Sequence, residues 1–425
     1  MKKIFHIIFI SLISFNLSAS HFVGGEITWE CIDDPTSIDF GKFIFQMKIY
    51  GDCTGIDFFS ASPGGSEQLT VHGHPTITSI DVFWDNTLDI SPTGAAGGPN
   101  PCYNCSNAPA GVLPGFVVEE HTYRSLPISL GNGNIPDPTG AVWNSVTNSY
   151  DVLPRGWHFT WGSAARNAAD NMQFGAGSWL LRAVMYPYTK NTSVTPFVYE
   201  DAFPCYDSSP LFKETAKTLL CMDVPFSYSH LAFDADFDSL AYSWAYPLDG
   251  SSFSYDPANP ATFGEMSFSN TTNGGAYDFS VTEQIPTNPA FPLTLNPGTG
   301  EISFMNDVMQ GNFVTCVRVR SVKCFQPIAD VFREVQVVVT GTACNLASGI
   351  PNTPPTITAP VGTQNWTTYL NSAGLPSYST EVMAGELVEF DVIANDIDIF
   401  REINLAYNCN ALFYESNSSH SLAQT

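Results

Sequence analysis

Residues 42–50 read KFIFQMKIY, and apolar and polar side chains alternate along this stretch. In an extended chain the apolar side chains of one face are Phe43, Phe45, Met47 and Ile49. The side chains between them include Gln46 and Lys48. A period of two residues is typical of a β-strand with one face in a core and the other in water. The stretch therefore predicts a strand.

Three further stretches predict strands. Residues 313–322 and 333–340 alternate in the same way, whereas residues 178–186 (SWLLRAVMY) are apolar on both faces. A strand that is apolar on both faces is typical of the centre of a core. Segments rich in Gly, Pro and Asn separate these runs and predict turns. Only residues 162–172 (GSAARNAADNM) could form a helix, and a short one. We therefore expect an all-β chain built from tandem β-sandwich modules.

The composition supports this class and limits the partners. Aromatic and charged residues each make up 13% of the chain, and 32 Gly and 30 Pro supply many turns. The 41 acidic residues outnumber the 16 basic ones, which gives a formal net charge of −25. Because phosphate binding depends on Lys and Arg, this balance excludes a nucleic-acid partner. An acidic surface favours divalent cations instead.

The first 20 residues predict a signal peptide. Lys2 and Lys3 precede an apolar run over residues 4–17, and the small residues Ser18, Ala19 and Ser20 follow. The alternative is a retained membrane anchor, but the run is shorter than the roughly 20 apolar residues of a membrane span. We expect cleavage near Ser20, secretion, and no transmembrane segment in the mature chain.

The remaining length predicts two or three domains. Residues 232–236 (AFDAD) match residues 394–398 (ANDID), and a Pro-rich linker at residues 349–355 precedes the second copy. The expected divisions are a β-rich domain at 21–215, an Ig-like or cadherin-like β-sandwich at 216–345, and a linker with the start of a further sandwich at 346–425. Because such a sandwich needs about 100 residues, we expect the natural protein to continue, or its last 25 residues to be out of frame.

Ten cysteines in an exported chain predict disulfides. Connectivity does not follow from sequence, and nearness along the chain gives the pairs Cys31–Cys53, Cys102–Cys105, Cys205–Cys221 and Cys316–Cys324, with Cys344 and Cys409 left over. Cys102 and Cys105 could instead bind zinc, although no second CxxC or histidine pair lies nearby.

Four segments, in order along the chain, resemble one family. It comprises the large surface proteins of Bacteroidota that carry gliding-motility-associated C-terminal domains and use type IX secretion. The segments are HFVGGEITWEC (21–31), KIYGDC (48–53), Asp207-Ser208-Ser209-Pro210-Leu211-Phe212 and DADFDSLAYS (234–243). The resemblance covers roughly residues 18–345 and implies display at the cell surface. It departs at Ala164 and Ala165, where the family usually has a cysteine pair, so any disulfide made there is lost.

Asp234, Asp236 and Asp238 form the candidate metal site. Alternating carboxylates on a loop can converge on calcium, which takes six to eight oxygen ligands. Calcium loops of this pattern generally have glycine after the second or third acid, where this chain has Phe237 and Ser239. The alternative is an acidic turn whose side chains bond their own backbone. Asp396 and Asp398, with Asp391 nearby, repeat part of the pattern.

Two weaker candidates are histidines and tryptophans. His72 and His74 would share the polar face of a strand with Thr70 and could begin a metal site with His121 or Asp81. The alternative is that they are ordinary surface histidines. The sugar-stacking candidates, which could equally be core residues, are Trp143, Trp157, Trp161 and Trp179.

The sequence contains no G-x-S-x-G elbow, no H-E-x-x-H motif and no Gly-rich phosphate loop. We therefore expect no enzyme and no cofactor other than calcium. The leading hypothesis is a structural or adhesive cell-surface protein, linked by the resemblance to gliding motility, whose partners are other surface proteins or extracellular glycans. The alternatives are a carbohydrate-binding module and a secreted hydrolase.

Overall fold

The structure is a computed structural model. The residues that it describes are 22–53, 60–91, 105–106, 117–131, 135–163, 166–172, 178–216, 218–250, 255–259, 264–269, 277–341, 356–380, 383, 387, 389–391 and 393–395. These residues form strands, turns and connecting segments, so the prediction of an all-β chain is confirmed. Within these ranges there is no helix long and apolar enough to cross a membrane.

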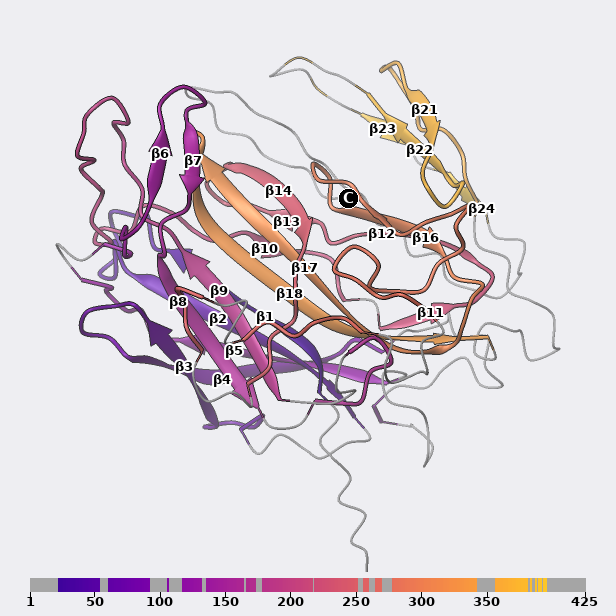
Figure 1. Ribbon diagram of the computed structural model, residues 1–425, viewed down its shortest axis with the longest axis horizontal. Coiled ribbons are helices and arrows are strands. Elements are labelled where there is room, and N and C mark those ends of the chain that lie inside the picture. Colours follow the sequence, from indigo (N-terminus) through magenta and orange to yellow (C-terminus); the bar gives the residue numbers. More distant parts are fainter. Residues whose placement is uncertain are drawn as a thin grey trace, which may run out of the picture.

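Eleven strands make one large sheet, which dominates the molecule (Figure 1). They are β1 (Phe22–Cys31), β2 (Phe43–Asp52), β3 (Ser66–His72), β4 (Ser79–Asp89), β5 (Val118–Ser125), β8 (Trp157–Ser163), β9 (Trp179–Met185), β11 (Leu219–Cys221), β14 (Ser239–Trp244), β17 (Gly311–Lys323) and β18 (Gln326–Thr340). The four predicted strands coincide with β2, β9, β17 and the end of β18.

The remaining strands form small sheets. They are β6 (Val142–Asn144) with β7 (Ser149–Val152); β10 (Leu211–Phe212) with β13 (Ala232–Phe233); β12 (Pro225–Ser229) and β15 (Thr294–Leu295) on either side of β16 (Glu301–Met305); β19 (Thr356–Ile357) with β24 (Ala394–Asn395); β20 (Val361–Gly362) with β23 (Phe390–Asp391); and β21 (Thr367–Leu370) with β22 (Pro376–Ser379).

Part of the large sheet closes on itself. The strands run in the order β1-β2-β5-β4-β3-β8-β9-β18, and β18 pairs back with β1 through Gly24↔Val335 and Gly25↔Glu334. The close approach requires glycine, because a Cβ on Gly24 would overlap the carbonyl oxygen of Glu334. We call this set of strands the ring. Its packed interior includes Trp29, Phe45, Trp157, Phe159 and Trp179.

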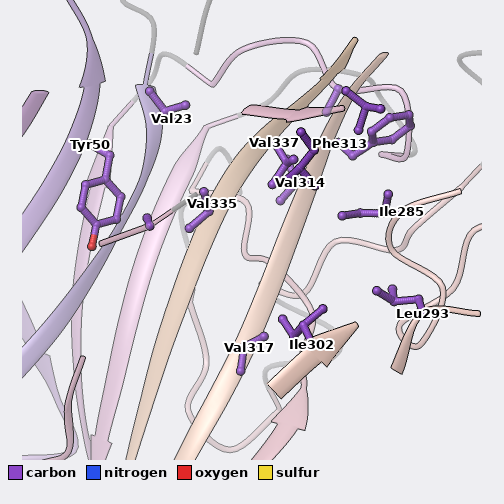
Figure 2. Close-up of a cluster of buried hydrophobic side chains, with 14 of the residues drawn as sticks. Val23, Tyr50, Ile285, Leu293, Ile302, Phe313, Val314, Val317, Val335 and Val337 are labelled. Carbon is purple, nitrogen blue, oxygen red and sulfur yellow. The ribbon is translucent and has the colours of Figure 1, made fainter. Parts of the chain in front are cut away.

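Beyond the ring, β17 and β14 continue the sheet from the other edge of β18, and a second core lies against them. Figure 2 shows Val317 of β17 beside Ile302 of β16, and Leu293 lies beyond Ile302 on the same side. Two layers with apolar side chains between them are the packing of a β-sandwich.

Strand β18 belongs to both cores. All of its 15 residues are buried, and it pairs with β1, β9, β11 and β17. Strands on both sides of the boundary predicted between residues 215 and 216 therefore share one hydrogen-bonded sheet. The boundary itself stays a prediction.

The short helix that residues 162–172 could have formed is absent from the described residues of this segment. Residues 162–163 end β8, and residues 166–172 have no helical turn. Polar side chains hold this segment in place: Asn167 donates to the carbonyl of Phe22 (3.0 Å), and Asn171 donates to the carbonyl of Val314 (2.8 Å) and accepts from its N–H (2.9 Å). Bonds to distant strands outweigh the weak local preference for helix.

The predicted cysteine pairs are also wrong. The structure pairs Cys31 with Cys205 and Cys53 with Cys105, which removes the first three predicted pairs and leaves no free Cys105 thiolate for zinc. Cys221 is disulfide-bonded too. Cys316 and Cys324 are free thiols, because they lie on β17 and on the turn that follows it. Outside the described residues lie Cys102, Cys344 and Cys409.

Candidate functional site

The predicted metal residues lie on the loop between β13 and β14. Asp234 is buried, and its Oδ1 accepts hydrogen bonds from the backbone N–H groups of Asp236 (3.0 Å) and Asp238 (3.2 Å). Phe237 adopts a positive φ of 61°, a conformation that usually favours glycine. The loop thus makes the sharp turn that a glycine would have allowed. The phenyl ring of Phe237 is exposed and packs edge-on against the ring of Phe233.

The fold adds a fourth carboxyl group, which the sequence alone did not indicate. Asp207 is only 3% exposed, and its Oδ1 lies 3.3 Å from Nζ of Lys323 at the end of β17. The same Nζ lies 3.1 Å from Oδ2 of Asp238. We call the group Asp207, Asp234, Asp236, Asp238 and Lys323 the acidic junction.

Further hydrogen bonds tie the acidic junction to the sheet. The N–H of Ser208 donates to Oδ2 of Asp236 (2.6 Å), and the hydroxyl of Ser321 donates to Oδ2 of Asp234 (2.8 Å). Three segments that are distant in sequence therefore meet at this point. They are residues 207–208, the 234–238 loop and the end of β17.

The electrostatics of the acidic junction are unbalanced, since four carboxyl groups face one ammonium group. Burial raises the pKa of Asp207 well above its ordinary value, Lys323 opposes the shift, and the neighbouring carboxylates add to it. Burial likewise raises the pKa of Asp234 to about 6, against the hydrogen bond from Ser321. Burial lowers the pKa of Lys323, but Asp207 and Asp238 outweigh it and raise the pKa overall.

One oxygen of the acidic junction is buried without a partner. Among the described residues, Oδ2 of Asp207 has no hydrogen-bond donor. The carboxyl group of Asp238 is close enough to bond to that of Asp207, but only if one of the two carries a proton. Either a proton or a cation would satisfy this oxygen.

The second acidic pattern cannot be compared with the first. Asp391 lies on β23 with an exposed side chain, and Asp396 and Asp398 lie outside the described residues. The two sequence copies do place short strands alike, since β13 and β24 both end just before the acids.

His72 and His74 make packing and hydrogen-bond contacts within the fold. The ring of His74 packs on Trp157 at 4.4 Å, its Nδ1 accepts the N–H groups of Thr76 and Ile77, and its Nε2 bonds the carbonyl of Leu130. His72 bonds the hydroxyl of Thr160 (2.8 Å). Across the described residues, no group of three metal ligands includes either histidine.

The four tryptophans do not form a platform. Trp157, Trp161 and Trp179 are buried inside the ring. Trp143 lies apart on the β6–β7 hairpin, half-buried against Tyr150 (4.8 Å) and Phe197 (5.5 Å).

A sequence signal for Asp207 did exist, because the segment at residues 207–212 already belonged to the resemblance. Lys323 gave none, since a lysine at the end of a strand is common and only the tertiary fold brings it to the carboxyl groups. No family model, curated protein or solved structure matches the chain.

Proposed function

We propose that this chain is a secreted cell-surface protein with a structural or adhesive role, related in function to the gliding-motility surface proteins that it resembles. The observation that carries the proposal is the Cys31–Cys205 disulfide, which ties segments 174 residues apart. Structural disulfides persist in oxidising, extracytoplasmic compartments. Together with the N-terminal signal pattern, they support export.

Two cavities in the described part of the chain hold about 10 and 30 Å³. Each has room for one or two water molecules. The larger lies in the second core beside His230, a buried histidine whose two ring nitrogens have no partner among the described residues.

The test is labelling of intact cells of the source organism with a membrane-impermeant biotin reagent. We expect the chain to be labelled before lysis and its mature N-terminus to lie near His21. Deletion of the coding region should reduce surface attachment or spreading. A periplasmic protein, which should label only after lysis, serves as the control. Labelling of this chain only after lysis would reject surface display.

Glycan binding is the second candidate, and one observation favours it. Trp143, Tyr150, Phe197 and Tyr199 form a partly exposed cluster on and beside the β6–β7 hairpin. Aromatic rings with an apolar body are the usual stacking surfaces for sugars. A glycan array with the wild type and Trp143→Ala would decide. Specific signals that the variant loses would favour this candidate, whereas a blank array would favour the structural role.

A further inference from the structure

Three side chains of the acidic junction contact one another pairwise. Nζ of Lys323 lies 3.3 Å from Oδ1 of Asp207 and 3.1 Å from Oδ2 of Asp238. The carboxyl groups of Asp207 and Asp238 also lie close enough to share a hydrogen bond. An amine and two carboxyl groups are thus in mutual contact. Formation of an amide bond needs these parts, because it requires a nucleophile, an electrophilic carbon and a group that carries protons between them.

The two carboxyl groups differ in their surroundings. The side chain of Asp207 is 3% exposed, and that of Asp238 is 11% exposed. Burial raises the pKa of Asp207 well above its ordinary value, which favours the protonated and more electrophilic carboxyl group. No N–H or hydroxyl group of the described residues donates to Oδ2 of Asp207. This oxygen can therefore leave without the loss of such a bond, and the more exposed Asp238 is the better proton carrier.

The fold holds the three groups in place before any reaction. Asp207 lies two residues after Cys205, whose disulfide with Cys31 fixes that segment. Lys323 is the last residue of β17. The backbone N–H of Asp238 donates to the carboxylate at the start of its own loop (3.2 Å). Groups that are held together in this way react at a high effective concentration.

We propose that Lys323 and Asp207 form an intramolecular amide bond, which cross-links the end of β17 to the 207–208 segment. Asp238 accepts a proton from the ammonium group of Lys323, and the free amine attacks Cγ of the protonated Asp207. The Cγ–Nζ bond forms and the Cγ–Oδ2 bond breaks. Oδ2 leaves as water with the proton that Asp238 returns, and Asp238 then takes a second proton from Nζ. The reaction consumes no oxidant, and its other product is one water molecule.

The surroundings of Lys323 govern the reaction in both directions. Burial lowers its pKa, but Asp207 and Asp238 raise the pKa overall, so the free amine forms only when a carboxylate takes its proton. Its side chain is 24% exposed, which gives the released water a way out. The product is favoured because a neutral amide replaces a buried ion pair and removes the cost of keeping two charges from water.

The experiment is a tryptic digest of the full mature chain after denaturation, reduction and alkylation of its cysteines. In an unlinked chain, trypsin cuts after Lys323 and releases residues 321–323 (SVK). Trypsin does not cut after an acylated lysine. The linked chain should therefore yield residues 191–213 joined to residues 321–333, and this product should be lighter than the two separate peptides by one water molecule.

Four variants assign the roles. Lys323→Arg keeps the positive charge but cannot form the amide, and Asp207→Ala removes the acyl group. Asp238→Ala leaves both bonding partners and removes the proton carrier. Lys48→Arg is the matched control, because Lys48 lies 2.9 Å from Glu120 and its side chain is also 24% exposed. Circular dichroism establishes that each variant is folded.

We expect the joined peptide from the wild type and from Lys48→Arg, and its loss in the other three variants. The wild-type digest decides by itself if a variant does not fold, since free residues 321–323 as its main product would overturn the proposal. A link from Lys323 to Asp238, located by fragmentation, would overturn the assignment of Asp207. An unchanged yield of the joined peptide from folded Asp238→Ala would overturn the role of Asp238. None of these outcomes depends on where the chain is displayed.

Discussion

Glu26 of β1 and Arg333 of β18 form a buried ion pair across the pairing that closes the ring. Nη2 of Arg333 lies 3.1 Å from Oε1 of Glu26, Nε bonds the other oxygen, and both side chains are almost inaccessible. Tyr50 also donates to this carboxylate (2.9 Å). Glu334, the next residue of β18, forms a second buried ion pair with Arg166. These two buried ion pairs thus lie at the β1–β18 pairing that Gly24 and Gly25 make sterically possible.

The ion pair predicts an asymmetric double-mutant cycle. Glu26→Gln should lower the free energy of unfolding by about 3–5 kcal/mol, because it leaves the charge of Arg333 buried and uncompensated. Combining it with Arg333→Met should restore part of this loss. Urea titration of the full chain measures both effects. The exposed pair Lys190–Glu200 is the control, and Lys190→Met should cost no more than about 1 kcal/mol. Equal costs at the two pairs would contradict the buried role.

The close approach of β1 and β18 at Gly24 predicts that a larger side chain at this position destabilises the protein. Gly24→Ala should destabilise the chain by about 1–3 kcal/mol or more, since the added methyl meets backbone atoms of β18, which cannot rotate away. Gly298→Ala is the matched control, because the nearest atom to its new Cβ would be 3.6 Å away. Thermal melting compares the two. If Gly24→Ala melts with the wild type, β1 and β18 are not in the contact described.

The disulfides predict a peptide map. Digestion without reductant should yield one linked pair that contains Cys31 and Cys205 and another that contains Cys53 and Cys105. Reduction should release both. A link between Cys31 and Cys53 would refute the fold of the N-terminal strands.

The free thiols predict selective alkylation. Cys324 is exposed and should react with a maleimide in the native protein, whereas Cys316 is buried, and burial raises its pKa. Cys316 should therefore react only after unfolding. Mass spectrometry of labelled peptides before and after denaturation tests this order, and early labelling of Cys316 would show that the small cluster it forms with Tyr186 and Phe332 is open.

His158 predicts a pH effect with a definite sign. Its Nδ1 bonds the hydroxyl of Tyr255 (2.7 Å), its Nε2 bonds the carbonyl of Arg155 (2.8 Å), and burial lowers its pKa from 6.5 to about 4. As the pH falls, the histidine of the unfolded chain therefore takes up its proton at a higher pH than His158 of the folded chain does. Stability from this group is complete above pH 6.5 and is lost as the pH falls toward 4, by about 3 kcal/mol.

The measurement is the difference in unfolding free energy between the wild type and His158→Gln, which stays neutral, at pH 7.5 and at pH 4. The wild type should lose stability relative to the variant on acidification. The difference is needed because Asp234, with its raised pKa, acts in the opposite direction. A difference independent of pH would place His158 in contact with water.

The strands were predictable because a period of two reports directly which face is buried. Phe43, Phe45, Met47 and Ile49 are all buried, as their spacing required. The covered polar face of β18 was not predictable. Glu334 and Gln336 are buried there because Arg166 and Asn167 reach them from a segment about 168 residues away. No local pattern records such a partner, and the composition of the same segment was also compatible with a short helix.

The cysteine pairs could not be predicted for a related reason. Cys31 and Cys53 are close in sequence, but Cys31 ends β1 and Cys53 follows β2, at opposite ends of this antiparallel pair. Their disulfide partners are Cys205 and Cys105. In the acidic junction, Asp234, Asp236 and Asp238 lie on one loop, so the sequence alone already groups them. Asp207 and Lys323 come from elsewhere, and only the tertiary fold brings them to that loop.

The pairing of β1 with β18 also limits how early this protein can complete its fold. Glu26 and Arg333 are 307 residues apart, so the first strand waits for its final neighbour until most of the described chain has been synthesised. Contacts so distant in sequence make folding slow, and until then the edge of β1 stays open to other chains. A chain with this topology is therefore most open to aggregation in the interval before its last long strand is available.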